Sequence, residues 1–186
     1  LLLIIIPVNT INTLKSGKLT ALFNMADCDL AISQELLFSA NGKNEGMVYE
    51  KLEEVQEFLR ENGIKAEVFQ EILFRLNISH GGKTSSSFAF LGVGGVTADR
   101  YAYLEGTAPR EKGEVALSYI TADKIEADIG DTVEIDLGGQ TKKFIVTAIN
   151  QSMNNFGEGI RFYEGEEIDF NLAVGSFAVQ IRYQDN

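Results

Sequence analysis

The chain has 186 residues, enough for one or two domains that each bury a core. Hydrophobic residues make up 45% and aromatic residues 10%, a composition that excludes disordered and collagen-like chains. The net charge of −11 opposes contact with phosphate backbones, and the sequence has no basic patch to offset it, so nucleic acid is excluded as a partner. A single cysteine, Cys28, excludes an internal disulfide and a cysteine-based zinc site.

The chain begins with an apolar stretch, Leu1 to Ile6, followed by Pro7. This stretch is too short to span a bilayer alone, since about 20 apolar residues are needed. Two interpretations fit it: a buried edge strand of a soluble protein, or the outer end of a transmembrane helix that starts before Leu1. Behind it, apolar residues at helical spacing suit a stalk that rises from a membrane.

The next part of the chain reads as strand, helix and strand. Leu30 and Ile32 share one face of a short strand. Apolar residues at i, i+4, i+7 and i+11 predict an amphipathic helix over 48–62, and Gly63 is its stop signal. Alternation then predicts a half-buried strand, with one face formed by Ala66, Val68, Ile72, Phe74 and Leu76 and the opposite face by Lys65, Glu67, Glu71 and Arg75.

The remainder is rich in strands. Residues 80–95, with many glycines and serines, predict a turn that leads into a weak strand. Ser118 offers the cap of a short helix at 119–127. The other predicted elements are strands at 114–117, 132–137 and 143–149, a hairpin turn at Gly138-Gly139, and a strand-rich run over 171–183. The mixture predicts the α+β class.

Catalytic motifs are weak in this sequence. His80-Gly81-Gly82-Lys83-Thr84 ends like a phosphate-binding loop, but the first glycine of that motif would fall at Asn77, and no helix follows. A turn between strands is the better interpretation. His80 is the only histidine, so a Ser-His-Asp site would need it beside a serine from 85–87, and no Gly-x-Ser-x-Gly elbow is present. We predict no catalytic, cofactor or metal site, and a chain that is not an enzyme.

Four consecutive segments together form one sequence pattern. They are Tyr103-Leu104-Glu105-Gly106-x-x-Pro109, Gly113-Glu114-Val115-Ala116-Leu117-Ser118, Ile129-Gly130-Asp131-Thr132-Val133 and Phe144-Ile145-Val146-Thr147-Ala148-Ile149. This pattern resembles the extracytoplasmic (periplasmic core) domain of FtsX-like and MacB-like ABC transporter permeases. The resemblance covers residues 100–150 well and the rest more loosely. Ala148 stands where the family commonly has glycine. The motifs are moderately specific, because Gly-Asp-x-Val recurs in many small β-barrels.

The resemblance implies an architecture. A ferredoxin-like (porter-like) subdomain would comprise residues 25–79 and 164–186, and a small β-rich subdomain would be inserted at 80–163. Residues 1–24 would be the end of a transmembrane helix and a stalk, because such domains follow the first transmembrane helix. The domain would then lie outside the cytoplasm, at the cell membrane. A full porter unit would need a second helix and a final strand after Tyr183.

The function implied by the resemblance is non-catalytic. A separate cytoplasmic ABC ATPase subunit would hydrolyse ATP, and the permease would couple this to substrate export or to activation of an extracellular partner. A second permease copy or homologue would be a further partner, and no cofactor is implied. The candidates for the partner contact are the apolar residues Met153, Phe156, Ile160 and Phe162.

Two alternatives stay open at this point. The same four apolar residues could form a buried edge of the β-rich subdomain. The whole chain could also be a soluble small-ligand-binding or enzymatic domain that contains a β-barrel, in which Gly130-Asp131 lines a pocket.

Overall fold

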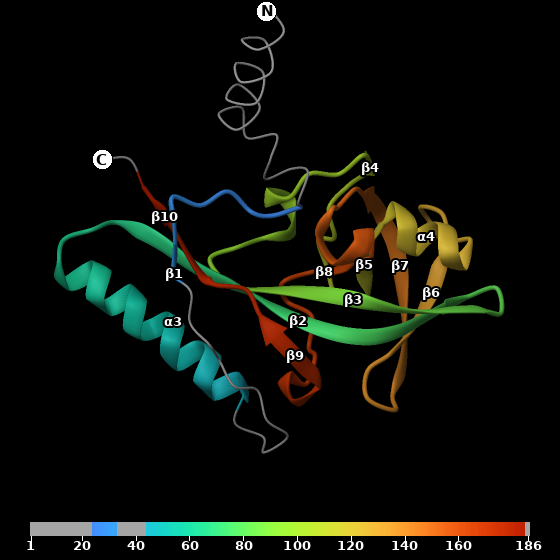
Figure 1. The fold of residues 1–186 in the computed structure, drawn as a ribbon, viewed down its shortest axis with the longest axis horizontal. Helices are drawn as coiled ribbons and strands as arrows, with labels where there is room; N and C mark the ends of the chain where they lie inside the picture. The colour runs from blue at the N-terminus through green and yellow to red at the C-terminus, as the bar shows by residue number, and fades with distance from the viewer. Residues whose placement is uncertain (1–23, 33–43, 185–186) are drawn as a thin grey trace, which may run out of the picture.

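The computed structural model of the chain describes residues 24–32 and 44–184 (Figure 1). The predicted membrane-helix end and stalk at residues 1–24 therefore lie almost wholly outside the described residues. None of the helices in the two described ranges has both the length and the apolar character needed to cross a bilayer. The described chain contains the α-helices α3 (Asn44–Glu61) and α4 (Tyr119–Ile125) and a ten-stranded mixed sheet, which confirms the α+β class.

The sheet follows one main path with two strands paired beside it. The path is β1 (Leu30–Ile32), β10 (Val179–Tyr183), β2 (Ala66–His80), β3 (Lys83–Gly94), β8 (Ile160–Phe162), β5 (Glu114–Ser118), β7 (Thr141–Asn150) and β4 (Glu105–Gly106). Off this path, β6 (Thr132–Asp136) pairs with β2 and β7, and β9 (Ala173–Ser176) pairs with β2. The pairs β3–β8 and β5–β7 are parallel, so the sheet is mixed.

Six of the strands close into a ring, because β6 bonds to β2 on one side and to β7 on the other. The ring runs β2, β3, β8, β5, β7, β6 and back to β2. Phe144 and Phe162 belong to its core, and their rings meet edge to face with centroids 5.4 Å apart. Val115 and Val133 are fully buried in the same core. The ring is thus a small β-barrel filled by its own side chains.

The long hairpin β2–β3 joins the barrel to the rest of the sheet (Figure 1). Its strands pair from Phe69 with Gly94 to His80 with Lys83, and Gly81 and Gly82 form the two-residue turn with φ of 56° and 83°. Positive φ at both central residues suits such a turn, which supports the interpretation of this glycine pair as a turn. The strand predicted after the turn is present and is longer than the sequence indicated, because pairing with β2 and β8 overrides the low strand propensity of glycine and serine.

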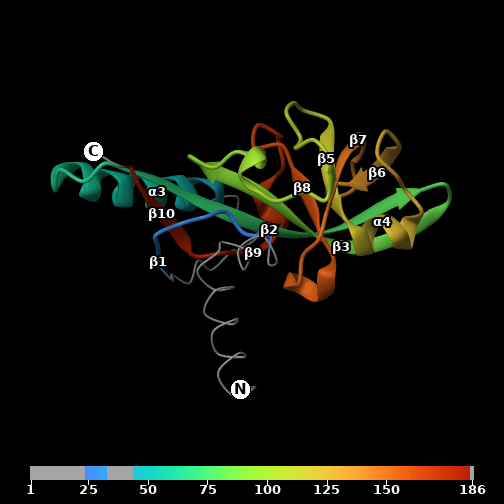
Figure 2. The ribbon, with the colours of Figure 1, turned by 90° about the horizontal axis from the view of Figure 1, so that it is seen from above.

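Helix α3 covers one face of the sheet at the other end of the molecule. It buries Val48, Leu52, Val55 and Leu59, the stripe that the spacing predicts, and starts four residues earlier than predicted. Gly63, with φ of 71°, follows its last turn. Figure 2 shows α3 at one end of the sheet and α4 beside the barrel at the opposite end.

The predicted division into subdomains stays a prediction, as does the ferredoxin-like arrangement. The boundary expected near residue 80 falls in the turn of the β2–β3 hairpin. Strand β2 pairs with β10 near its start and with β6 near its end, so one continuous strand belongs to both ends of the molecule.

Candidate partner-binding surface

The loop between β7 and β8 presents an aromatic side chain to solvent. Phe156 is 94% exposed, the largest value among the large apolar residues that the structure describes. Its backbone and that of Asn155 lie in the left-handed region, with φ of 59° and 50°. For a residue with a Cβ atom this conformation costs about 1–2 kcal/mol. The loop therefore holds this side chain in solvent although its backbone is strained.

The loop is held against α4. Gly157 lies so close to α4 that a Cβ atom there would come within 2.5 Å of the Ile120 Cδ1 atom. Glu158 forms an ion pair with Lys124 of α4, and its carboxylate lies 3.9 Å from Arg75 of β2. Phe156 therefore projects from a loop whose next two residues are fixed by the helix and the hairpin.

Buried hydroxyl groups fix the start of α4. Ser118 caps the helix, because its Oγ accepts a hydrogen bond of 3.2 Å from the Thr121 backbone N–H, as predicted. The Thr121 hydroxyl is bonded to the Ser87 hydroxyl at 2.8 Å and accepts from the Gly159 N–H at 3.0 Å. The Ser118 N–H donates to the Gly159 carbonyl at 2.8 Å. Helix, loop and β3 thus meet in one satisfied polar network.

We call Tyr119, Ile120, Met153 and Phe156 the α4 surface, since all four are exposed apolar or aromatic residues on α4 or on the loop that contacts it. Met153 and Phe156 were predicted for this role, and the structure places both at the surface. Their partner contact stays a prediction.

Ile160 and Phe162 do not belong to this surface. They lie in β8 and are 0% and 1% exposed, inside the barrel core. The prediction that these two residues contact a partner was wrong, because their side chains are buried. The pattern Gly-Ile-Arg-Phe looked the same as an exposed apolar run, but parallel pairing with β3 and antiparallel pairing with β5 place β8 in the middle of the sheet.

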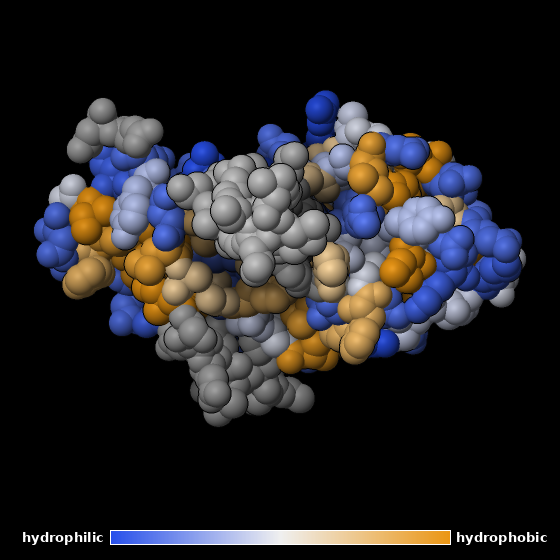
Figure 3. Space-filling view, turned by 45° about the horizontal axis from the view of Figure 1, so that its top comes forward, coloured by the Kyte–Doolittle hydropathy of each residue, from blue (hydrophilic) through white to orange (hydrophobic). Residues whose placement is uncertain are grey.

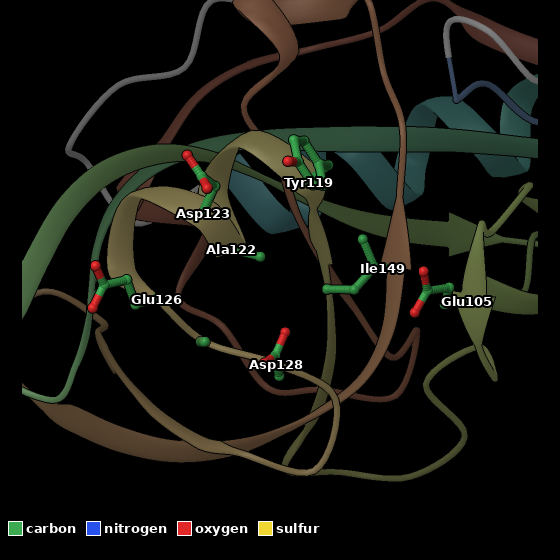
Figure 4. Close-up of a pocket in the computed structure, with 8 residues that line it drawn as sticks. Glu105, Tyr119, Ala122, Asp123, Glu126, Asp128 and Ile149 are labelled. Carbon is green, nitrogen blue, oxygen red and sulfur yellow. The ribbon is translucent and has the colours of Figure 1, made fainter.

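A pocket of about 330 Å³ opens beside Tyr119 (Figure 4). Ala122 and Ile149 contribute apolar wall. Its rim is acidic: Glu105 of β4 lies across the pocket from Asp123 and Glu126 of α4 and its C-cap, with Asp128 between them.

The charge of the pocket is mostly uncompensated. Glu126 pairs with Lys83 at the hairpin, whereas no ion pair found among the described residues includes Glu105, Asp123 or Asp128. Within the described ranges, no group of three or more His, Cys, Asp or Glu side chains is arranged to hold a metal ion. The pocket and the α4 surface together suit a partner that offers apolar groups next to positive charge.

The residues considered for catalysis have structural partners. The His80 Nδ1 atom lies 3.0 Å from the Glu126 carbonyl oxygen, and Nε2 lies 3.7 Å from the Asp131 carboxylate. No hydrogen bond found in the described part of the chain joins His80 to a serine. Ser87 bonds to Thr121 as described above, and Ser86 accepts from the Arg75 side chain at 3.0 Å.

A buried ion pair lies where the barrel meets the α3 end. Arg161 of β8 and Glu71 of β2 are 2% and 0% exposed and bond to each other. The Arg161 guanidinium carbon lies 3.3 Å from the ring centroid of Tyr101, and Nη2 donates to the Asn24 carbonyl at 3.2 Å. This contact holds the first described residue of the chain against the sheet.

The surroundings of this pair shift several pKa values. Burial opposes the charge of Arg161, but Glu71 and the two nearby tyrosines, Tyr101 and Tyr103, hold its pKa above the ordinary value. Burial raises the pKa of Tyr101, opposed by the charge of Arg161. Burial likewise raises the pKa of Tyr103 to about 12. The tyrosines therefore stay neutral beside the arginine at any physiological pH.

Sequence reasoning missed this pair. Alternation assigned Glu71 to the exposed face of β2, together with Lys65 and Arg75. That face is covered locally, because Phe69, two residues away on the same face, packs with Ala26, Val96 and Tyr101 in a second small core. The apolar Phe69 among charged residues was the one sequence signal that this face of β2 is locally buried.

No protein-family model and no curated protein matches the sequence. Among solved structures, the fold is similar to the extracellular domain of the ABC-type transporter YknZ from Gram-positive bacteria, at 12% identity and a TM-score of 0.47, with 72% of each chain covered. It is also similar to a domain assigned to a permease protein from Porphyromonas gingivalis, at 14% identity and a TM-score of 0.43, with 69% of this chain and 60% of that chain covered.

The sequence resemblance and these solved structures name the same class of protein.

Proposed function

We propose that this chain is the non-catalytic extracytoplasmic domain of an FtsX-like ABC transporter permease. It couples ATP hydrolysis by a separate cytoplasmic subunit to substrate export or to activation of a partner outside the cell. The observation that carries this proposal is that the four motif segments between residues 103 and 149 form one contiguous unit: the barrel strands β5, β6 and β7, strand β4 paired with β7, and helix α4.

The motif residues shape the backbone. Gly106 leaves room for β7, since a Cβ atom there would lie 2.2 Å from the Thr147 carbonyl oxygen. Gly130 adopts φ of 94° at the corner before β6, and the Asp131 carboxylate accepts from the Asp128 N–H at 2.8 Å to close that turn. Ser118 caps α4. Each of these four residues therefore has a structural role, which supports the interpretation of the motif as part of a scaffold.

The proposal also needs a mechanical connection from the membrane side to the recognition side. Arg161 supports one, because it bonds to Asn24 at the start of the described chain and sits in β8, directly after the loop that carries Phe156. A displacement of the segment at Asn24 would be transmitted to β8 through this hydrogen bond. Coupling then requires a partner that binds the two positions of this loop with different affinity.

The subunit composition of the parent protein tests the proposal. Affinity purification from detergent-solubilised membranes of the source cell should recover this polypeptide together with a stoichiometric subunit that hydrolyses ATP. Recovery of the polypeptide from the soluble fraction, or from membranes without an ATPase subunit, would overturn it.

A photo-crosslinking residue tests the α4 surface separately. Benzoylphenylalanine replacing Phe156 in the full-length protein should crosslink to an extracytoplasmic protein or substrate in intact cells. Val174, 57% exposed and located in β9, is the matched control position and should give no such product. Equal crosslinking from the two positions would contradict a partner contact at Phe156.

A further inference from the structure

Exposed apolar and aromatic residues flank the acidic pocket on two sides. Tyr119 lies on the α4 side and is 61% exposed. On the β4 side, Leu104 directly precedes the pocket residue Glu105 and is 58% exposed. Ile129 directly follows the pocket residue Asp128 and is 42% exposed. The pocket therefore lies within a larger apolar surface, which extends beyond the α4 surface defined above.

Strand β4 holds the far rim of this pocket in place. The chain that enters β4 is bonded to β7, because the Leu104 N–H donates to the Ile149 carbonyl at 2.8 Å. Ile129 packs against the same strand, since a Cβ atom at Gly106 would lie 2.9 Å from the Ile129 Cδ1 atom. Figure 4 shows Glu105 of β4 on the opposite side of the pocket from α4. Figure 3 shows hydrophobic residues in separate groups over the barrel end, at the right of the view, with hydrophilic residues between them.

The charge of this surface selects the occupant. Four of the described residues that line the pocket are acidic and none is basic. Only Glu126 among these four has a basic partner within the described part of the chain, Lys83. A second copy of this chain, with a net charge of −11, would bring more negative charge to the pocket, and so would an anionic lipid surface. A cationic occupant is therefore electrostatically complementary.

The size of the pocket and its apolar flanks favour a polypeptide over a free small cation. A volume of about 330 Å³ is at the lower end of the range of about 300–1,000 Å³ for small-molecule sites. A small cation would leave the apolar residues on both sides uncovered, whereas a polypeptide covers them with the neighbours of its basic residue. Tyr119 offers an aromatic ring at the rim, on which a guanidinium group can stack.

We propose that the extracytoplasmic partner of this domain is a polypeptide that inserts an arginine or lysine side chain into the pocket. Apolar residues on each side of the basic residue pack on Leu104 and Ile129 and on Tyr119. The proposal rests on the proposed function, because it identifies the partner that the same surface of the permease domain would bind.

Selection of peptides from a random library tests this chemistry. Random dodecapeptides displayed on phage are selected on the immobilised chain, and the most enriched peptide is synthesised with a fluorescent label. Enriched sequences should contain an arginine or lysine with apolar residues on both sides. Replacing that basic residue with glutamine should weaken binding about tenfold or more, measured by fluorescence anisotropy. Enrichment of peptides without a basic residue, or no enrichment, would overturn the proposal.

Charge variants of the chain locate the binding site. Glu105→Gln/Asp123→Asn changes two exposed pocket residues and should weaken binding about tenfold, a loss that should shrink as salt is added. Glu50→Gln/Glu61→Gln removes the same charge from exposed positions of α3, so it is the matched control and should bind nearly as well as the unmodified chain. Equal affinity of the two double variants would show that the peptide does not use the pocket.

The apolar contact is tested in the same assay. Leu104→Ser should weaken binding about tenfold, because it removes an apolar side chain that the peptide buries. Val174→Ser, at a similarly exposed position of β9, is the matched control. Equal affinity of these two variants would contradict the proposal. So would sedimentation showing that the chain dimerises and that Leu104→Ser abolishes the dimer, since a second copy would then be the occupant.

Failure of this proposal and failure of the proposed function give different results. The binding assay needs no ATPase subunit. Loss of the preference for basic peptides, with an ATPase subunit still recovered from the membrane, would reject only the basic partner. Recovery of the polypeptide without an ATPase subunit, with the preference intact, would reject only the permease role.

Discussion

The barrel and the α3 end belong to one sheet, yet they differ in how their strands are paired and in how fully their apolar side chains are buried. In the barrel, each strand has a partner on both sides, and the side chains of β5, β6, β7 and β8 fill the interior. At the α3 end, β1 pairs only with β10 among the described strands, and Leu30 and Ile32 remain exposed. Closure gives every barrel strand two neighbours, whereas β1 has one neighbour among the described strands.

This difference concerns how each end is held together. At the barrel end, the fully buried Thr121 hydroxyl of α4 bonds to Ser87 of β3 and to the Gly159 N–H in the loop that carries Phe156. Helix α3 is held by its hydrophobic stripe and by two side-chain hydrogen bonds, in which Asn44 donates to the Phe170 carbonyl at 3.1 Å and Gln56 donates to the Ala66 carbonyl at 3.2 Å. Arg161 and Glu71 lie between the two ends and connect them.

Removing one member of the connecting ion pair should have the largest effect. Arg161→Met leaves Glu71 charged and buried, which should lower the free energy of unfolding by about 3–5 kcal/mol. Urea denaturation followed by circular dichroism measures the change. The double variant Glu71→Met/Arg161→Met should recover most of the loss, because no unpaired charge stays buried. A double variant as unstable as Arg161→Met would show that packing of the arginine, and not its charge, holds the two ends together.

A cavity under α3 should affect mainly the open end. Leu52 is 6% exposed in the stripe that faces the sheet. Leu52→Ala should cost about 2–5 kcal/mol, and amide hydrogen exchange should increase in α3 more than in β5 to β7. Phe58→Ala, at an exposed position of the same helix, is the control and should change neither quantity. An equal increase of exchange in the barrel strands would show that both ends unfold as one unit.

Loss of the helix cap tests the barrel end with a smaller change. Ser118→Ala removes the acceptor for the Thr121 N–H and should lower the free energy of unfolding by about 1 kcal/mol. Ser86→Ala serves as control, since Ser86 is on β3, outside the network, and should be nearly neutral. If the two variants were equally stable, α4 would be held by packing and the hydroxyl network would contribute little.

Local patterns predicted much of the fold. The stripe of α3 and the turns at Gly81-Gly82 and Gly138-Gly139 are properties of short segments, and the structure contains them. The alternation of β2 holds from Ile72 to Ile78 but fails at Phe69 and Glu71, which are buried. The strand β3 was underestimated, because its stability comes from partners far away in the sequence.

The candidate site was predicted only in part. Met153 and Phe156 are exposed as expected, but Ile160 and Phe162 are buried, because burial depends on which strands flank β8. The acidic pocket could not be predicted, since Glu105 of β4 and Asp123 of α4 line one pocket only after β4 has paired with β7.

The sequence alone determined the class of fold, the helix stripe, the caps and the glycine turns, because each depends on backbone preferences and periodicity within a few residues. Only the tertiary structure decided that β6 closes a barrel, that Glu71 meets Arg161 and that Ile160 and Phe162 lie in the barrel core. Each of these depends on contacts between segments far apart in the chain. The stabilising free energy of these contacts arises only when those segments come together, so a pattern within a few residues cannot predict it.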